Sequence, residues 1–289
     1  MKKFFAVLMA AVLLVSCVAV FAACDKKDEA TLVMATNAAF PPYEFKEGDK
    51  IVGIDAEIAA AIAEKLGMKL EIVDVDFGAV LTGVSEGKYD MGMAGITVTE
   101  DRKKTMDFSN TYATGIQVII VNEGSEITSL DSLFVFDDEG NPTALQNTDI
   151  KIGVQQSTTG DIYSSDAVTK WGFNDLNEDG SIKTDRVVRY KTGADAIQAL
   201  KTGKVDCVII DNEPAKSFVK ANEGIHILEG ENEYAVEDYA ICVKKGNSEL
   251  LDKINKALAD LKADGTIDGI IEKYIPSKVA ADTEADTAA

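Results

Sequence analysis

Residues 93–109 decide the fold and read MAGITVTEDRKKTMDFS. A strand that we predict at 89–96 ends in this segment, and a short helix is predicted to start after Thr99. Free backbone N–H groups, the hydroxyls of Thr97 and Thr99, and the guanidinium of Arg102 therefore converge at one point. Oriented N–H donors and a planar guanidinium together make a receptor for a carboxylate.

Arg102 is the residue of this segment that most directly indicates binding. The other arginines are Arg186 and Arg189, although lysine and arginine together number 29. A generic surface cation in this chain would therefore more readily be a lysine. From the chemistry alone, an exposed arginine after a helix cap is an equal alternative.

On either side of this segment, strand-like and helix-like patterns alternate, which is typical of an α/β fold. Strands are predicted at 31–35, 70–75, 89–96, 117–121, 151–155, 187–190, 205–210, 225–228 and 239–244, and helices at 54–66, 80–87, 159–170, 194–201, from 214, 250–261 and 266–275. The strand 117–121 joins two sets of similar size. We expect two lobes with a cleft between them, where ligands lie at strand ends beside helix N-termini.

The N-terminus has the layout of an export signal. Lys2 and Lys3 precede an apolar run over 4–23, and small residues lead to Cys24. An uncleaved membrane anchor is the alternative, because about 20 apolar residues can span a bilayer. A cysteine at the boundary argues against that alternative, since it resembles the lipid-attachment site of lipoproteins.

Two cysteines fit a lipid-attachment site. Cys17 follows the better consensus, Leu14-Val15-Ser16, whereas Cys24 is followed by the polar segment 25–29. Cutting before Cys17 would leave residues 18–23 as an exposed apolar stretch, so we expect a signal peptide at 1–23 and lipid on Cys24. Two acyl chains there would give stable anchoring to the outer face of the membrane.

Composition excludes several classes of function. The net charge of −20 disfavours nucleic acid as a partner. His226 is the single histidine, so a zinc site and a Ser/His triad are poorly supported, and no metal or cofactor is expected. Cys207 and Cys242 lie in apolar strand-like runs, which favours buried free thiols over a disulfide.

Several motifs in order, spread over residues 31–275, give a specific resemblance. They are FPPYEF at 40–45, GID at 53–55, the segment 93–109, and VDCVIID at 205–211. Together they resemble the bacterial extracellular solute-binding proteins for polar amino acids, of the glutamine-binding-protein type. The resemblance implies a two-lobed periplasmic-binding-protein fold of type II, hinged by two crossing segments, that closes over its ligand.

The resemblance also implies roles for individual residues. Arg102 would bind the ligand α-carboxylate, helped by Thr97, by the backbone around Gly95 and, from the second lobe, by Thr158. Asp211 would accept the α-ammonium. Phe40 and Phe77 would flank the ligand side chain, and Tyr239 would lie near one of the crossings between the lobes.

These roles are physically consistent, because charged groups in a closed cleft must be paired. Arg102 and Asp211 on opposite lobes would make closure depend on the ligand. For Asp211 the alternative is a helix cap before Pro214, and a single aspartate could do both. Without the resemblance, Phe40 and Phe77 are better explained as ordinary core.

Two positions depart from the family pattern and bear on the ligand. Many members carry an acidic residue at the position of Asn37, and glutamine-binding protein carries a lysine at that of Gln155. The neutral Asn37 argues against arginine or lysine, and Gln155 argues against transferring glutamine specificity. We therefore expect a polar, uncharged amino acid.

Two further segments are not explained by the motifs. Residues 134–149 look like an insertion and are predicted to form an acidic surface hairpin or loop. Residues 175–186 begin like a calcium loop, but position 12 is Arg186 instead of an acid, and a strand is predicted at 187–190. A polar turn is the better interpretation.

The resemblance thus implies the substrate-binding protein of an ABC importer, without a chemical step, monomeric and docking on a membrane permease. We expect a tether at 24–30, a first lobe at 31–115 and 238–276, a second lobe at 116–237 and a polar tail at 277–289. The alternatives are a prephenate-type dehydratase on the same fold, which would use Glu44 or Asp211, and the sensor domain of a receptor.

Overall fold

The computed structural model describes residues 30–228 and 236–276. The predicted signal peptide, both lipid-attachment candidates (Cys17 and Cys24), the tether up to residue 29 and the tail at 277–289 lie outside the described residues. Within the two described ranges, no helix combines the length and the apolar character that a membrane crossing requires.

The first lobe is built on a sheet with the strand order β5-β1-β6-β18-β7. β1 runs parallel to β5 and β6, whereas β18 is antiparallel to β6 and β7. Helices α2, α8 and α9 pack together, and α3 packs on β1, β6 and β18. The bounds are β1 Thr31–Thr36, α2 Ile54–Leu66, β5 Lys69–Asp74, α3 Phe77–Glu86, β6 Met91–Gly92, α4 Glu100–Lys103, β7 Met106–Phe108, β18 Cys242–Lys244, α8 Ser248–Ala263 and α9 Thr266–Tyr274. A small sheet of β2 Ala39–Phe40, β3 Glu44–Glu47 and β4 Lys50–Val52 completes this lobe.

The second lobe is built on a sheet with the strand order β14-β11-β15-β8-β16. Helices α5, α6 and α7 pack against its strands. The bounds are β8 Ala113–Asn122, β11 Ile152–Gln155, α5 Thr159–Ser165, β14 Val187–Tyr190, α6 Gly193–Lys201, β15 Cys207–Asp211, α7 Asn212–Ala221 and β16 Ile225–Ile227.

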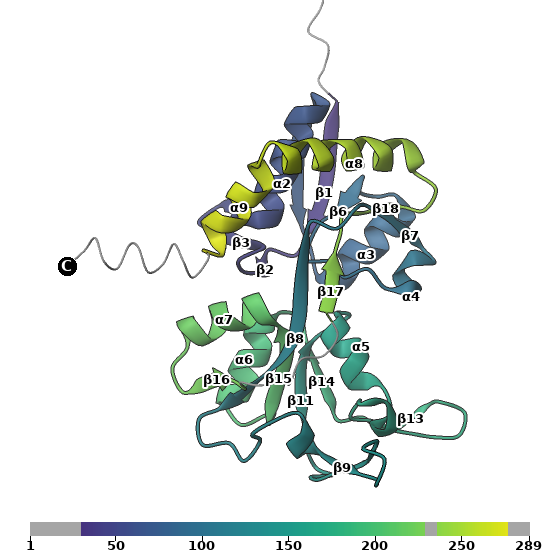
Figure 1. Cartoon of the computed structure of the whole chain (residues 1–289), viewed down its shortest axis with the longest axis vertical. Coiled ribbons are helices and arrows are strands. Elements are labelled where there is room, and N and C mark those ends of the chain that lie inside the picture. Colours follow the sequence, from purple (N-terminus) through teal and green to yellow (C-terminus); the bar gives the residue numbers. More distant parts are fainter. Residues whose placement is uncertain (1–29, 229–235, 277–289) are drawn as a thin grey trace, which may run out of the picture.

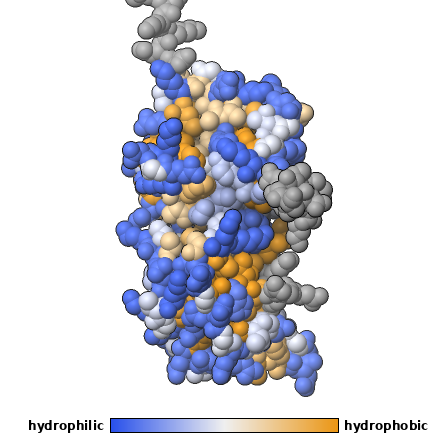
Figure 2. Space-filling model, turned by 90° about the vertical axis from the view of Figure 1, so that its left-hand side faces the viewer, coloured by the Kyte–Doolittle hydropathy of each residue, from blue (hydrophilic) through white to orange (hydrophobic). Residues whose placement is uncertain are grey.

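Two strands run between the lobes. β8 extends from the first lobe at the top of Figure 1 to the second lobe at the bottom, and β17 (Val236–Tyr239) pairs antiparallel with its first half. The predicted α/β architecture of two lobes linked by two crossing segments is confirmed. Most of the face drawn in Figure 2 is hydrophilic on both lobes, with smaller hydrophobic areas between.

Helix α2 shows how closely local pattern determined these elements. Ile54, Ile58 and Ile62 recur at helical spacing and are fully buried. The helix ends where predicted, at Gly67, whose φ of 64° lets its N–H bond to the carbonyl oxygens of Ala63 and Glu64.

Three predicted elements are too long. The strand predicted at 239–244 is divided, because Tyr239 ends β17 and only residues 242–244 form β18. The strand predicted at 89–96 is reduced to β6, because the chain leaves the sheet and Gly95 takes a φ of +54°. The helix predicted at 159–170 ends at Ser165, and a single 3-10 turn, Val168–Lys170, follows it.

The inserted segment 134–149 does form a hairpin, of β9 (Phe134–Phe136) and β10 (Pro142–Leu145). One face of this hairpin is buried, however, because Phe134 and Leu145 pack in the hydrophobic core of the second lobe. The prediction of an acidic surface element is therefore right only for the outer face.

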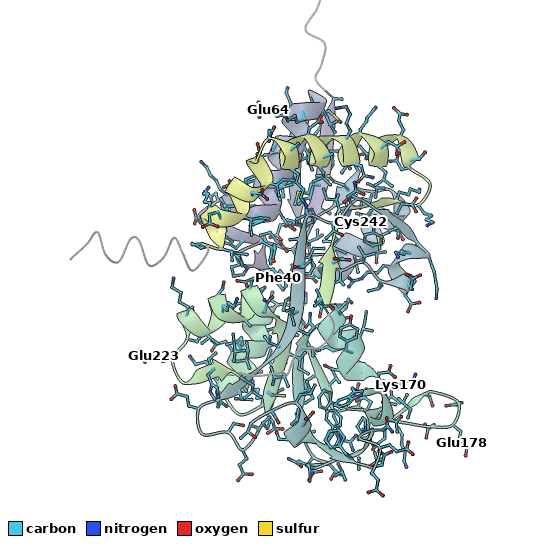
Figure 3. The ribbon with its side chains drawn as sticks, in the orientation of Figure 1. Phe40, Glu64, Lys170, Glu178, Glu223 and Cys242 are labelled. Carbon is cyan, nitrogen blue, oxygen red and sulfur yellow. The ribbon has the colours of Figure 1, made fainter. Side chains whose placement is uncertain are left out.

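The segment with calcium-loop spacing forms a second hairpin, of β12 (Asp175–Leu176) and β13 (Ile182–Thr184). Asp175 forms an ion pair with Arg186 at 2.9 Å, and the Asp179 carboxylate accepts hydrogen bonds from Ser181. Figure 3 shows Glu178 in the part of this hairpin that projects from the second lobe. Within the described ranges, no group of three or more His, Cys, Asp or Glu side chains could hold a metal ion.

Cys207 and Cys242, both among the described residues, are buried and free. That prediction is confirmed.

Candidate ligand-binding site

A small cavity lies between the lobes, with about 290 Å³ not filled by protein atoms, part of it open to solvent. Its lining comes from both lobes: Asn37, Phe40, Glu44, Phe77, Ala94, Gly95, Thr97, Arg102, Gln155, Thr158, Thr159 and Asp211. The structure thus brings every predicted ligand-binding residue to one cavity. Figure 3 labels Phe40, which lies beside β8 at the level where the lobes meet.

The fold positions these side chains at strand ends. Asn37 follows β1, Gln155 ends β11 and Asp211 ends β15. Because β11 and β15 are parallel, their carboxyl ends meet at the same edge of the second sheet, and this edge faces the first lobe.

Arg102 lies on α4, a single turn capped by the Thr99 hydroxyl, which accepts a hydrogen bond from the Arg102 backbone N–H at 3.2 Å. Its guanidinium donates to the Thr97 carbonyl at 2.8 Å and, across the cleft, to the Ser157 carbonyl at 3.1 Å. Burial lowers the pKa of the guanidinium, which nevertheless stays charged at neutral pH. Two of its five N–H donors are used in these bonds, so three remain for a ligand.

The guanidinium carbon lies 5.4 Å from the centre of the Phe77 ring, a cation–π arrangement. Phe77 and Phe40 line the cavity and also belong to the hydrophobic clusters of the molecule, so the core interpretation and the site interpretation both apply.

The predicted threonines differ in what their hydroxyls do. Thr158 is the N-cap of α5: its hydroxyl accepts from the Asp161 N–H at 3.3 Å and donates to the Gln155 carbonyl at 2.8 Å. The hydroxyls that face each other across the cleft are those of Thr97 and Thr159, 3.5 Å apart.

Asp211 is buried at the second-lobe side of the cavity. Although it precedes α7, its side chain makes no capping hydrogen bond to that helix, whose residues are all described. Its carboxylate instead accepts a hydrogen bond from the Tyr239 hydroxyl. Burial, and secondarily the charge of Glu237, raise the pKa of Asp211 to about 7.

Glu237, on the crossing strand β17, is a buried acid that sequence reasoning missed. Its Oε2 accepts hydrogen bonds from Thr97 at 3.2 Å, from Gln117 at 3.0 Å and from Thr159 at 3.1 Å. One carboxylate thus connects hydroxyls of both lobes at the point where the chain crosses between them.

Asn37 and Gln155 meet across the cleft. The Gln155 side-chain amide donates to Asn37 Oδ1 at 2.9 Å, and Asn37 donates to the Val75 carbonyl at 2.9 Å. Together with the contacts of Arg102 and Thr97 to the second lobe, this bond shows the two lobes closed on each other.

The backbone N–H of Gly95, expected near the ligand carboxylate, donates to Asp55 Oδ2 at 2.9 Å. A side chain at position 95 would lie 2.9 Å from the Phe40 ring, so the glycine allows Phe40 to close the cavity wall.

Glu44, which sequence reasoning named only for the dehydratase alternative and not as a ligand-binding residue, lines the cavity itself. It is fully buried, next to the fully buried Asp55 of α2. Burial, and then the neighbouring Asp55, raise the pKa of Glu44 well above its usual range. The sequence signal was present, since Glu44 lies inside the FPPYEF motif, but a motif match does not tell which side chain of a hairpin faces the cleft.

Comparisons with known proteins identify the family and the fold. The family model described as "Bacterial extracellular solute-binding proteins, family 3" matches residues 32–277. The arginine-binding extracellular protein ArtP of Bacillus subtilis (strain 168) is 30% identical over 84% of this chain and 85% of its own length.

Solved structures are similar over the same range. The substrate-binding protein of an amino acid ABC transporter matches with a TM-score of 0.72 and 32% identity, over 86% of this chain and 100% of that chain. An ancestral arginine-binding protein matches with a TM-score of 0.70, over 86% of this chain and 99% of that chain; it was solved bound to arginine (39% identity) and bound to glutamine (38%).

Proposed function

Since the chain belongs to the bacterial extracellular solute-binding proteins of family 3, we propose that it captures a polar α-amino acid between its lobes and delivers it to the membrane permease of an ABC importer. The similar proteins are amino-acid-binding proteins, and this chain is likewise a binding protein and not the dehydratase that shares the fold. The relatives named for arginine binding and for amino acid ABC transport support the amino-acid ligand.

One observation supports the proposal more than any other: Arg102 and Asp211, both buried, line the same cavity from opposite lobes. A zwitterion needs a cationic and an anionic partner at a fixed separation. The free N–H groups of Arg102, with the hydroxyls of Thr97 and Thr159, would bind the α-carboxylate, and Asp211 would bind the α-ammonium. Each lobe then contributes one charge, so the ligand favours the closed arrangement.

The ligand side chain would lie between Phe40 and Phe77 and against Asn37, Gln155 and Glu44. The amides of Asn37 and Gln155 support an uncharged side chain, because amides offer both donors and acceptors. The buried carboxyl of Glu44 favours a second candidate, a cationic side chain. The ancestral relative that was solved with both arginine and glutamine shows that one such site can hold either type.

The proposal extends to the ends of the chain and to the crossings. We place the mature protein at the outer face of the membrane as a monomer, held by lipid on Cys24 through the tether 24–30. Residues 116–237 would move as the second lobe, with the crossings in β8 and β17 as hinges.

The test is a thermal-shift and calorimetric screen of residues 25–289 against the common amino acids, cystine and prephenate. A ligand that binds only the folded protein raises the melting temperature with concentration. We expect one or a few polar amino acids to do so, and the shift to disappear in Arg102→Ala and Asp211→Asn. Absence of any shift, or a shift that both variants retain, would refute the site.

A further inference from the structure

Glu44 and Asp55 form a pair of carboxyl groups without a cation. Both side chains are fully buried, and no hydrogen-bond donor of the described residues reaches either Glu44 oxygen or Asp55 Oδ1. Asp55 Oδ2, in contrast, accepts from the Gly95 N–H and from the Tyr112 hydroxyl, each at 2.9 Å. Two ionised carboxylates side by side in such a place would be strongly unfavourable.

A single proton shared by the pair removes this repulsion, because a protonated Glu44 can donate a hydrogen bond to the Asp55 carboxylate. The two donors to Asp55 favour its ionised form, which leaves the proton on Glu44. Consistent with this assignment, the pKa of Asp55 is raised by burial only to about 6, whereas that of Glu44 is raised well above its usual range.

The other charged and titratable groups near Glu44 do not neutralise the pair. Asp211 from β15, and the hydroxyls of Tyr43 and of Tyr112 before β8, are acids that are neutral or negative. Arg102 of α4 lines the same cavity, but its side chain donates to the Thr97 and Ser157 carbonyls. The wall of the cavity therefore has the capacity for one more positive charge.

We propose that Glu44 and Asp55 share one proton, which the site keeps for a neutral amino acid and releases to solvent when a cationic side chain binds to Glu44. The inference rests on the proposed function and deepens it by naming Glu44 as the residue that determines side-chain charge. The exchange balances: the O–H bond of Glu44 breaks, the proton leaves to solvent, and the side-chain cation replaces it, so the charge of the site is unchanged.

If this proposal holds, the affinity for cationic amino acids depends on pH differently from the affinity for neutral ones. Affinity for a cationic amino acid should rise with pH, by up to tenfold per pH unit, until the pair ionises. A neutral amino acid should show no such dependence from this pair. Asp211 can also release its proton to solvent when the α-ammonium binds beside it, but it does so for both ligand classes, so the difference between the ligands isolates Glu44.

The experiment is isothermal titration calorimetry of residues 25–289 with arginine, lysine and glutamine at pH 7, in phosphate and in Tris. These buffers differ in ionisation enthalpy, so the heats report the protons exchanged. We expect about one more proton to be released for arginine or lysine than for glutamine. Glu44→Gln should abolish that difference and lower the arginine-to-glutamine affinity ratio at least tenfold. Glu47→Gln, an exposed acid on the same strand, should preserve it.

Other results of this experiment would contradict either the shared proton or the proposed function. Equal proton release for the cationic and neutral ligands, or an unchanged difference in Glu44→Gln, overturns the shared proton. Binding of neutral amino acids but of neither arginine nor lysine overturns it as well and leaves the proposed function intact. Failure to bind any amino acid refutes the proposed function, and the inference falls with it.

Discussion

The Arg102 guanidinium is held between two carbonyl groups that belong to different lobes. A planar group with five donors can make these two bonds and still bind a carboxylate at two points, whereas an ammonium cannot. Replacing Arg102 by Lys should therefore weaken amino acid binding by about 100-fold, the equivalent of about 3 kcal/mol for two bonds to a charged group.

Calorimetric titration with the ligand found in the screen measures this loss. Lys103→Ala is the matched control, because it removes a neighbouring cation that pairs at the surface with Glu100. Affinity within twofold of the wild type is expected for the control. The same affinity in Arg102→Lys would mean that the ligand carboxylate binds elsewhere.

Thr158 and Thr159 are adjacent residues with separable roles. Thr158→Ala removes the N-cap of α5 and should lower the free energy of unfolding by about 1 kcal/mol. Thr159→Val keeps the shape of a side chain whose hydroxyl faces Thr97, so it should instead lower ligand affinity by about tenfold. Urea unfolding and calorimetry on both variants distinguish the two effects, and the reverse pattern would assign the binding hydroxyl to Thr158.

The β9–β10 hairpin, formed by the inserted segment 134–149, contributes side chains to the core of the second lobe. Phe134 is 1% exposed and packs against Trp171 and Phe173, with ring centres 5.5 and 5.4 Å away, whereas the adjacent Val135 is 38% exposed. Phe134→Ala should destabilise the protein by about 3 kcal/mol or more, and Val135→Ala by about 0.5 kcal/mol or less. Equal effects in urea unfolding would show that the hairpin is not part of the core.

The elements also show how far the sequence could predict the structure. Helix α2 and strand β14 follow from spacing alone, because their patterns and stop signals are local. The strand expected at 89–96 was wrong because the turn at Gly95 depends on a partner from another element, the Asp55 carboxylate. For the same reason Glu237 was missed and Glu44 was not predicted to bind the ligand, since only the packing of β3 and β17 determines what their side chains face. The lobe boundaries stay a prediction.

For the whole molecule, the buried acids of the cleft set the direction of the pH dependence of stability. The pKa values of Glu44, Asp55 and Asp211 are all raised by burial, those of Asp55 and Asp211 to about 6 and about 7. Between about pH 4 and pH 7 the folded state therefore binds more protons than the unfolded state. Stability should fall as pH rises through this window, by up to about 1.4 kcal/mol per pH unit for each proton.

Surface acids act in the opposite direction, but at lower pH. Hydrogen bonds from Thr266, and then Lys65, lower the pKa of Asp264 to about 2, so its contribution is lost only below about pH 4. The melting temperature, followed by calorimetry, should thus rise from pH 7.5 to pH 5 and fall below pH 4. Asp211→Asn should flatten the slope between pH 5 and pH 7.5, whereas Asp264→Asn should leave that slope unchanged. A melting temperature that decreases steadily from pH 7.5 to pH 5 would mean that the cleft acids are ionised in the folded protein.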